Sequence, residues 1–168
     1  GMAMGQDPEM VYEVVAAVCA AVDVPVIPKL TPNVDDIAVI GRAAVDGGAS
    51  ALCAINTAGP GYTEHHGHPV LSNAMGGMSG KGVLPTALKA LKALRQETNV
   101  PLIGCGGLTS AADCRAAAHC GATIFGVGSG LTGMDTEEIG RFFADLYHDL
   151  GAGTDEAGKQ VRFDIDMG

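Results

Sequence analysis

Several residue types are scarce in this 168-residue chain, and each scarcity excludes a class of protein. Trp is absent, aromatic residues make up 4%, and 10 Lys and Arg stand against 19 Asp and Glu, for a net charge of −9. Because a nucleic-acid-binding surface needs a basic stripe along the phosphates, this charge argues against a nucleic-acid partner. A phosphorylated ligand would have to be held mainly by backbone amides and helix N-termini.

Long apolar runs and paired cysteines are also missing. No run approaches the roughly 20 residues of a membrane-spanning helix, and no signal peptide is recognisable. An odd number of cysteines without a CxxC motif predicts reduced thiols rather than a disulfide framework. We expect a soluble, cytoplasmic protein without a membrane partner. The five cysteines are Cys19, Cys53, Cys105, Cys114 and Cys120. We expect Cys53 and Cys105 to be packing residues and Cys114 and Cys120 to be structural.

Helical and apolar strand patterns alternate along the chain as far as residue 150. Asp7-Pro8 is typical of a helix start, and Asp135 with Glu138 forms a capping box before the last helix. Strands are expected at 24–30, 49–56, 100–104 and 123–127. Helices are expected at 8–22, 35–45, 85–98, 110–120 and 136–150, with a long loop at 58–83 and a polar, irregular tail at 151–168.

Apolar strands that alternate with helices predict a parallel sheet covered by helices, which is an α/β fold. A doubly wound sheet and part of a barrel both fit this pattern. A (β/α)8 TIM barrel needs eight units in about 250 residues. With four strands, five helices and a helix at its start, the chain would be half of such a barrel. We therefore predict a half-barrel over residues 1–150, followed by the polar tail.

Polar residues and glycines collect where the predicted strands end, and ligands bind at this edge in parallel α/β folds. The four strands end in Lys29, in Asn56-Thr57, in Gly104-Cys105-Gly106-Gly107 and in the segment 126–130, while the long loop carries Gly76-Gly77-Met78-Ser79-Gly80. The last two glycine turns match the place where barrels bind phosphate, because Gly lets backbone N–H groups approach closely. The alternatives are tight strand–helix turns for the glycines, an ion pair for Lys29 and strand-end caps for Asn56 and Thr57.

The run Glu64-His65-His66-Gly67-His68 raises the possibility of a metal site. No second group of ligands follows it at a recognisable spacing. We expect a solvated loop here and no bound metal.

Six ordered segments give the chain a resemblance to the class 1 dihydroorotate dehydrogenases, and most closely to the class 1B kind. The resemblance covers Gly1 to about Leu150. It is carried by the segments Pro28-Lys29-Leu30-Thr31-Pro32-Asn33, Ile55-Asn56-Thr57, Pro69-Val70-Leu71-Ser72-Asn73, Gly76-Gly77-Met78-Ser79-Gly80, Ile103-Gly104-Cys105-Gly106-Gly107 and Gly126-Val127-Gly128-Ser129.

The resemblance implies an FMN-dependent oxidation of dihydroorotate to orotate in pyrimidine biosynthesis, and a role for nine residues. Asn56 and Thr57 would hold the dihydroorotate ring. The FMN would be bound by Lys29, Ile55, Gly80, Gly106, Gly107, Gly128 and Ser129.

The catalytic base of the family is a cysteine, and the resemblance places it just before Gly1. We therefore expect a fragment of a longer enzyme, without a catalytic base of its own and inactive alone. Its expected partners are the missing N-terminal half-barrel, a second copy of the chain in a homo-oligomer, and an iron–sulfur flavoprotein subunit. Pro28 and Lys81-Gly82-Val83-Leu84 depart from the family pattern near the flavin.

Two other interpretations stay open. One is a non-catalytic half-barrel that binds a phosphorylated ligand or a partner half. The other is a barrel of the dihydropyrimidine dehydrogenase type, which shares the Lys-Leu-Thr-Pro-Asn motif. An upstream, in-frame segment with four further βα units and a Cys-bearing loop would favour the dihydroorotate enzyme.

Overall fold

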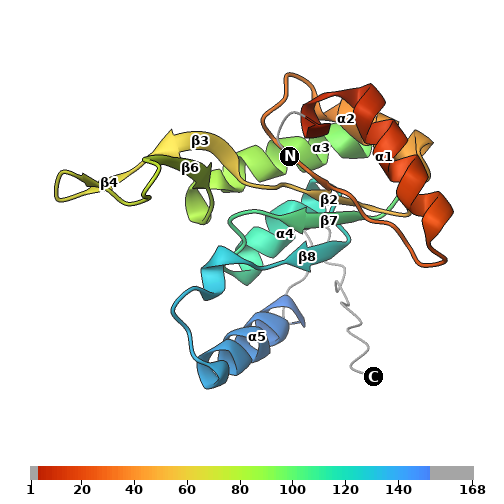
Figure 1. Ribbon diagram of the computed structural model, residues 1–168. Helices are drawn as coiled ribbons and strands as arrows, with labels where there is room; N and C mark the ends of the chain where they lie inside the picture. Colours follow the sequence, from red (N-terminus) through yellow and green to blue (C-terminus); the bar gives the residue numbers. More distant parts are fainter. Residues whose placement is uncertain (1–3, 152–168) are drawn as a thin grey trace.

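The computed structural model describes residues 4–151, in which five α-helices alternate with four parallel strands (Figure 1). The tail predicted to be irregular lies, from residue 152 on, outside the described residues. The parallel strands are β1 (Lys29–Leu30), β2 (Leu52–Ala54), β7 (Leu102–Cys105) and β8 (Ile124–Gly126). The helices are α1 (Pro8–Ala21), α2 (Ile37–Asp46), α3 (Leu84–Glu97), α4 (Ala111–His119) and α5 (Thr136–Gly151), with short 3-10 turns at Met4–Gln6, Lys81–Val83 and Ser129–Leu131.

The helices begin where side chains cap them. Asp7 accepts hydrogen bonds from the amides of Glu9 and Met10, which satisfies donors that the first turn of α1 leaves free. Asp135 and Glu138 each accept from the backbone amide of the other, so the predicted capping box before α5 is confirmed.

The four parallel strands lie in the order β1-β2-β7-β8, so each strand pairs with the next parallel strand along the chain. A doubly wound sheet reverses its strand order at a switch point, and no reversal occurs in this sheet. The helices also pack in sequence, α1 on α2, α2 on α3, α3 on α4 and α4 on α5. This arrangement is that of one half of a (β/α)8 barrel, as predicted.

The two faces of this sheet differ sharply in burial. Side chains alternate between faces along each strand. The outer face packs under the helices and carries Leu30, Leu52, Ala54 and Leu102, all buried. The inner face would line the inside of a complete barrel, and its side chains are exposed or half-buried: Lys29, Cys53, Ile103, Cys105 and Ile124. The prediction that Cys53 belongs to the core is therefore wrong.

The first strand is shorter than predicted, since only Lys29–Leu30 of the segment 24–30 forms a strand. Pro25 and Pro28 lack the N–H group that a ladder requires. The carbonyls of Val26 and Pro28 still accept hydrogen bonds from the amides of Ser50 and Cys53. The segment therefore runs beside the second strand without being a regular partner.

The segment predicted to be a long loop contains a β-hairpin instead. Strand β3 (Ala58–Tyr62) pairs antiparallel with β6 (Met75–Met78), and β4 (Glu64–His65) with β5 (His68–Pro69) closes its tip. The hairpin projects away from the sheet and helices (Figure 1). Between residues 4 and 151, the structure contains no helix with the length and apolar character that crossing a membrane requires.

Candidate functional site

A cavity of about 200 Å³ opens at the C-terminal ends of the parallel strands, and all nine residues predicted for the site lie on its wall. We call it the glycine cavity. The predicted residues on its wall are Lys29, Ile55, Asn56, Thr57, Gly80, Gly106, Gly107, Gly128 and Ser129. The remaining wall is formed by Met78, Ser79, Val83, Cys105, Leu108 and Gly130.

The turn after β7 needs glycine for reasons of space and backbone conformation. Gly106 and Gly107 have φ of 121° and 76°, in the region that favours glycine. A Cβ on Gly107 would lie 2.9 Å from the carbonyl oxygen of Gly80 and 2.9 Å from the backbone nitrogen of Leu84. The turn after β7 is therefore packed tightly against the segment that begins α3. The structural explanation of this glycine pair thus holds, and it is compatible with a role in binding.

Gly128, in the turn after β8, is not packed in this way. A Cβ on Gly128 would meet no atom within 4 Å, and the φ of Gly128 is negative, at −119°. In the described part of the chain, the backbone amides of Gly128 and Ser129 donate no hydrogen bond to a protein acceptor. Backbone amides that have no protein acceptor and border open space can donate hydrogen bonds to an anionic oxygen.

Lys29 lies on the inner face beside two cysteines. Its Nζ donates to the Sγ of Cys105 at 3.5 Å. A hydrogen bond from the Cys53 thiol lowers the pKa of Cys105 to about 6, an effect that Lys29 reinforces and partial burial opposes. The same hydrogen bond, together with burial, raises the pKa of Cys53. Cys53 and Lys29 thus favour the thiolate form of Cys105, which the sequence analysis treated only as a packing residue.

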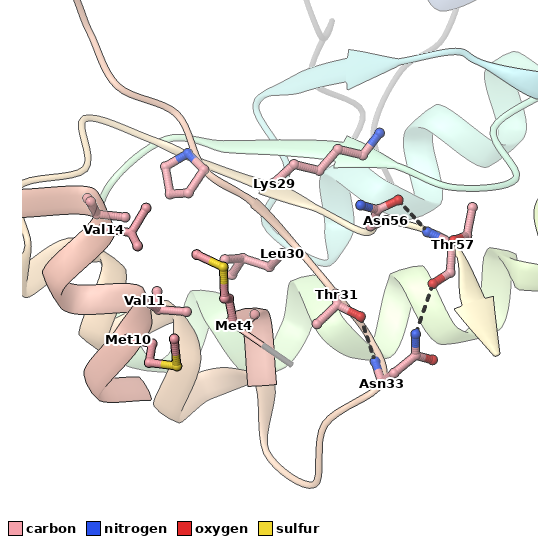
Figure 2. Close-up of a pocket in the computed structure, with 13 residues that line it drawn as sticks. Met4, Met10, Val11, Val14, Lys29, Leu30, Thr31, Asn33, Asn56 and Thr57 are labelled. Atoms are coloured by element: carbon pink, nitrogen blue, oxygen red, sulfur yellow. Dashed lines mark hydrogen bonds between the residues drawn. The ribbon is translucent and has the colours of Figure 1, made fainter. Parts of the chain in front are cut away.

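Asn56 and Thr57 are held at the end of β2 by a small polar network (Figure 2). The side-chain oxygen of Asn56 accepts from the Thr57 amide at 2.8 Å. Asn33, which the sequence analysis did not assign to the site, donates to the Thr57 carbonyl at 3.2 Å and accepts from the Gly59 amide at 2.8 Å. Asn33 therefore fixes the backbone that presents Asn56 and Thr57.

Asp113 joins two walls of the glycine cavity, and the sequence analysis missed it. This buried carboxylate pairs with Lys81, which directly follows Gly80, and accepts from the Thr109 amide and from the hydroxyls of Thr109 and Ser110. Burial alone would raise its pKa, but these donors outweigh burial and lower it to about 2. Asp113 thereby ties the loop that carries Gly80 to the turn that follows β7.

A larger cavity of about 440 Å³ lies on the other side of β1 and is mostly apolar. Lys29 and Leu30 leave the strand on opposite sides, Leu30 towards Met4 and Val11, Lys29 towards Asn56 (Figure 2). The two cavities share Lys29, Asn56 and Thr57, so these polar residues separate the apolar cavity from the glycine cavity.

The histidines of the sequence run lie at the tip of the hairpin, away from both cavities. Among residues 4–151, no three or more His, Cys, Asp or Glu side chains come close enough together to hold a metal ion.

Comparison with known proteins decides the family. The family model for dihydroorotate dehydrogenase matches residues 1–149. The chain belongs to the dihydroorotate dehydrogenase family. Curated relatives named as the catalytic subunit of dihydroorotate dehydrogenase B (NAD(+)) include those of Streptococcus pneumoniae, 45% identical over 77% of this chain, and Thermococcus kodakarensis, 45% identical over 79%. That of Methanosarcina acetivorans is 42% identical over 91% of this chain.

The chain spans less than half the length of these members of the family, with 42%, 44% and 47% of them covered. A crystal structure of the Eimeria tenella dihydroorotate dehydrogenase in complex with ferulenol has the same fold, with a TM-score of 0.68 at 17% identity. The similarity covers 86% of this chain and 45% of that one. This coverage agrees with a half-barrel.

Proposed function

We propose that the chain is the C-terminal half of an FMN-dependent dihydroorotate dehydrogenase, which oxidises dihydroorotate to orotate in pyrimidine biosynthesis. The observation that carries the proposal is the glycine cavity, in which Lys29, the Asn56-Thr57 pair and both glycine turns meet. The curated relatives that match this chain are named as the catalytic subunit of dihydroorotate dehydrogenase B (NAD(+)).

The residues of the glycine cavity suit FMN. The amides of Gly128 and Ser129 would hold its phosphate, with Gly80, Gly106 and Gly107 close by, and Ile55 would line the flavin. In the bound state FMN would supply the acceptor for the hydride that leaves the substrate. Lys29 would place a positive charge beside the ring, where negative charge develops on reduction. The chain's acidity is no obstacle, because amides rather than cations would contact the phosphate.

Asn56 and Thr57 would orient the dihydroorotate ring, because their side chains supply both donors and acceptors to polar ring atoms. Their position between the two cavities would bring the substrate to the flavin. The catalytic base, which removes a proton from the substrate, is proposed to lie in the sequence just before Gly1.

The bare inner face supports a complementary half-barrel as the partner of this chain. Ile124 on this face is more than half exposed in the chain alone. In a closed barrel, the corresponding face is covered by the other strands. The relatives are named as catalytic subunits, so we further propose an iron–sulfur flavoprotein subunit as a partner of the whole enzyme. We also propose homo-oligomers. The site of action is proposed to be the cytoplasm.

The test is anaerobic mixing of the purified, flavin-loaded parent protein with dihydroorotate, followed by the visible absorbance of the flavin. Dihydroorotate should bleach the flavin, and dihydrouracil should not. Bleaching by dihydrouracil alone would support the dihydropyrimidine dehydrogenase interpretation and contradict the proposal.

Asn56→Ala should leave the loaded flavin spectrum intact and raise the dihydroorotate concentration needed for half-maximal bleaching at least tenfold, about the cost of one lost hydrogen bond to a polar ring. Asn73→Ala is the matched control, since Asn73 lies on the hairpin outside both cavities. An unchanged concentration dependence in Asn56→Ala would contradict the assigned role.

A further inference from the structure

Cys53 and Cys105 lie beside Lys29 on the inner face, and the proposed binding of flavin and substrate gives neither cysteine a role. The three side chains come from three neighbouring strands, β1, β2 and β7, and all face the same side of the sheet. Cys105 also lines the glycine cavity, so a small molecule that enters this cavity reaches its sulfur.

A disulfide between the two cysteines is disfavoured by the strand register. Cys53 pairs with Ile103, which places Cys105 two residues further along the neighbouring strand. With about 3.3 Å per residue along a strand and about 4.8 Å between strands, the two Cα atoms lie roughly 8 Å apart. A disulfide needs Cα atoms closer than about 7 Å. The register therefore keeps both cysteines reduced.

A soft metal ion is disfavoured by charge. The Lys29 ammonium already donates to the Cys105 sulfur, so a cation at this point would meet a like charge at short range. An uncharged molecule with an electrophilic carbon meets no such repulsion. Lys29 and Cys105 both line the glycine cavity, whose volume of about 200 Å³ admits a small molecule when FMN is absent.

We propose that Cys105 is a covalent modification site for small, uncharged, conjugated carbonyl compounds. The Cys105 sulfur attacks the β-carbon of the activated alkene and forms a C–S bond. The π electrons of the C=C bond move to the carbonyl as an enolate, which takes a proton from solvent. Lys29 stabilises the enolate through its positive charge, and no oxidant or reductant is needed. The thioether occupies the glycine cavity of the FMN-free chain, so this modification and bound FMN exclude each other.

The test is alkylation of the purified chain by acrylamide at pH 6, with site-resolved rates from peptide mass spectrometry. Cys19 is the internal control, because it is also half-buried but donates its thiol to the Gly48 carbonyl. A thiolate with a pKa near 6 is more abundant than an ordinary thiolate at pH 6 but intrinsically less nucleophilic, which leaves a net advantage of about tenfold. Cys105 should therefore react about ten times faster than Cys19.

Two further measurements distinguish reactivity that Lys29 and Cys53 give to Cys105 from reactivity caused by solvent exposure alone. The rate at Cys105 should level off above about pH 7, where a thiol with a pKa near 6 is fully ionised. The charged and titratable groups that act on Cys105 are Lys29 and Cys53. Cys53→Ala should therefore remove most of the advantage at pH 6, because the Cys53 hydrogen bond is the largest cause of the lowered pKa. Lys29→Met should reduce the advantage by a smaller factor and Lys29→Arg should retain most of it, with the Cys19 rate unchanged in all three as evidence of an intact fold. Equal rates at Cys105 and Cys19 at pH 6, or a full advantage that survives in Cys53→Ala, would overturn the proposal.

Discussion

On one face of the four-stranded sheet, Leu52 and Leu102 are fully buried beneath the helices, whereas on the other face Ile124 is 52% exposed. The outer face holds the apolar contacts that stabilise the fold. The inner face holds Lys29, Cys53 and Cys105, whose chemistry contributes little to the core. Substitutions on the two faces should therefore separate stability from binding.

The largest effect is expected on the outer face. Leu102→Ala removes a fully buried side chain from the core and should lower the free energy of unfolding by about 3 kcal/mol. Ile124→Ala on the neighbouring strand should cost less than about 1 kcal/mol, because that side chain is half exposed already. Urea denaturation at two protein concentrations measures both. Equal losses of unfolding free energy in the two variants would mean that the inner face is covered in solution. That result would contradict the difference in burial between the two faces.

The two glycine turns that border the glycine cavity should also differ in how much a substitution lowers stability. Gly107→Ala should cost about 2–3 kcal/mol, because the new Cβ would collide with backbone atoms and φ is 76°. Gly128→Ala should cost less than about 1 kcal/mol, since its Cβ enters open space. Thermal unfolding of the two variants provides the comparison. A large loss in Gly128→Ala would show that this turn, too, is constrained by packing.

Asp113 is expected to give an intermediate effect that depends on pH. Its folded-state pKa of about 2 lies below the ordinary value for Asp, so its stabilisation is complete above about pH 5 and is lost as the pH falls towards 2. Asp113→Asn should cost about 1–2 kcal/mol at pH 7 and progressively less below pH 4. Urea denaturation at pH 7 and pH 3 checks this, and a loss of the same size at both pH values would exclude the charge as the cause.

The smallest effect is expected at Lys29. Its side chain is exposed on the inner face, so Lys29→Met should change the free energy of unfolding by no more than about 0.5 kcal/mol. Urea denaturation at pH 7 measures it. A loss above 1 kcal/mol would assign Lys29 a structural ion-pair role, the alternative that the sequence left open.

Much of the fold could be predicted because local signals are strong in this chain. Asp7 and the Asp135–Glu138 pair cap helices where the sequence predicts them. The alternation of helices and apolar strands predicted the parallel sheet. Because parallel strands all end at one edge, residues far apart in the sequence could be assigned to one site.

The remaining features depend on contacts between distant segments. The hairpin strands Ala58–Tyr62 and Met75–Met78 contain four glycines and lack the alternation of a typical strand, so only their pairing reveals them. Cys53 looked like a core residue because an apolar strand suggests burial on both faces, and this chain covers only one. The pattern Ser110-Ala111-Ala112-Asp113 was a capping signal that could have identified Asp113.

The most direct test of the account is titration of the chain with FMN, followed by flavin fluorescence, in the wild type, Gly128→Val and Gly140→Val. Gly140 is the matched control, because its Cβ would also enter open space but its position on α5 lies outside the cavity. The account predicts saturable binding that Gly128→Val abolishes and Gly140→Val retains. No binding by the wild type, or undiminished binding by Gly128→Val, would contradict a phosphate site in the glycine cavity.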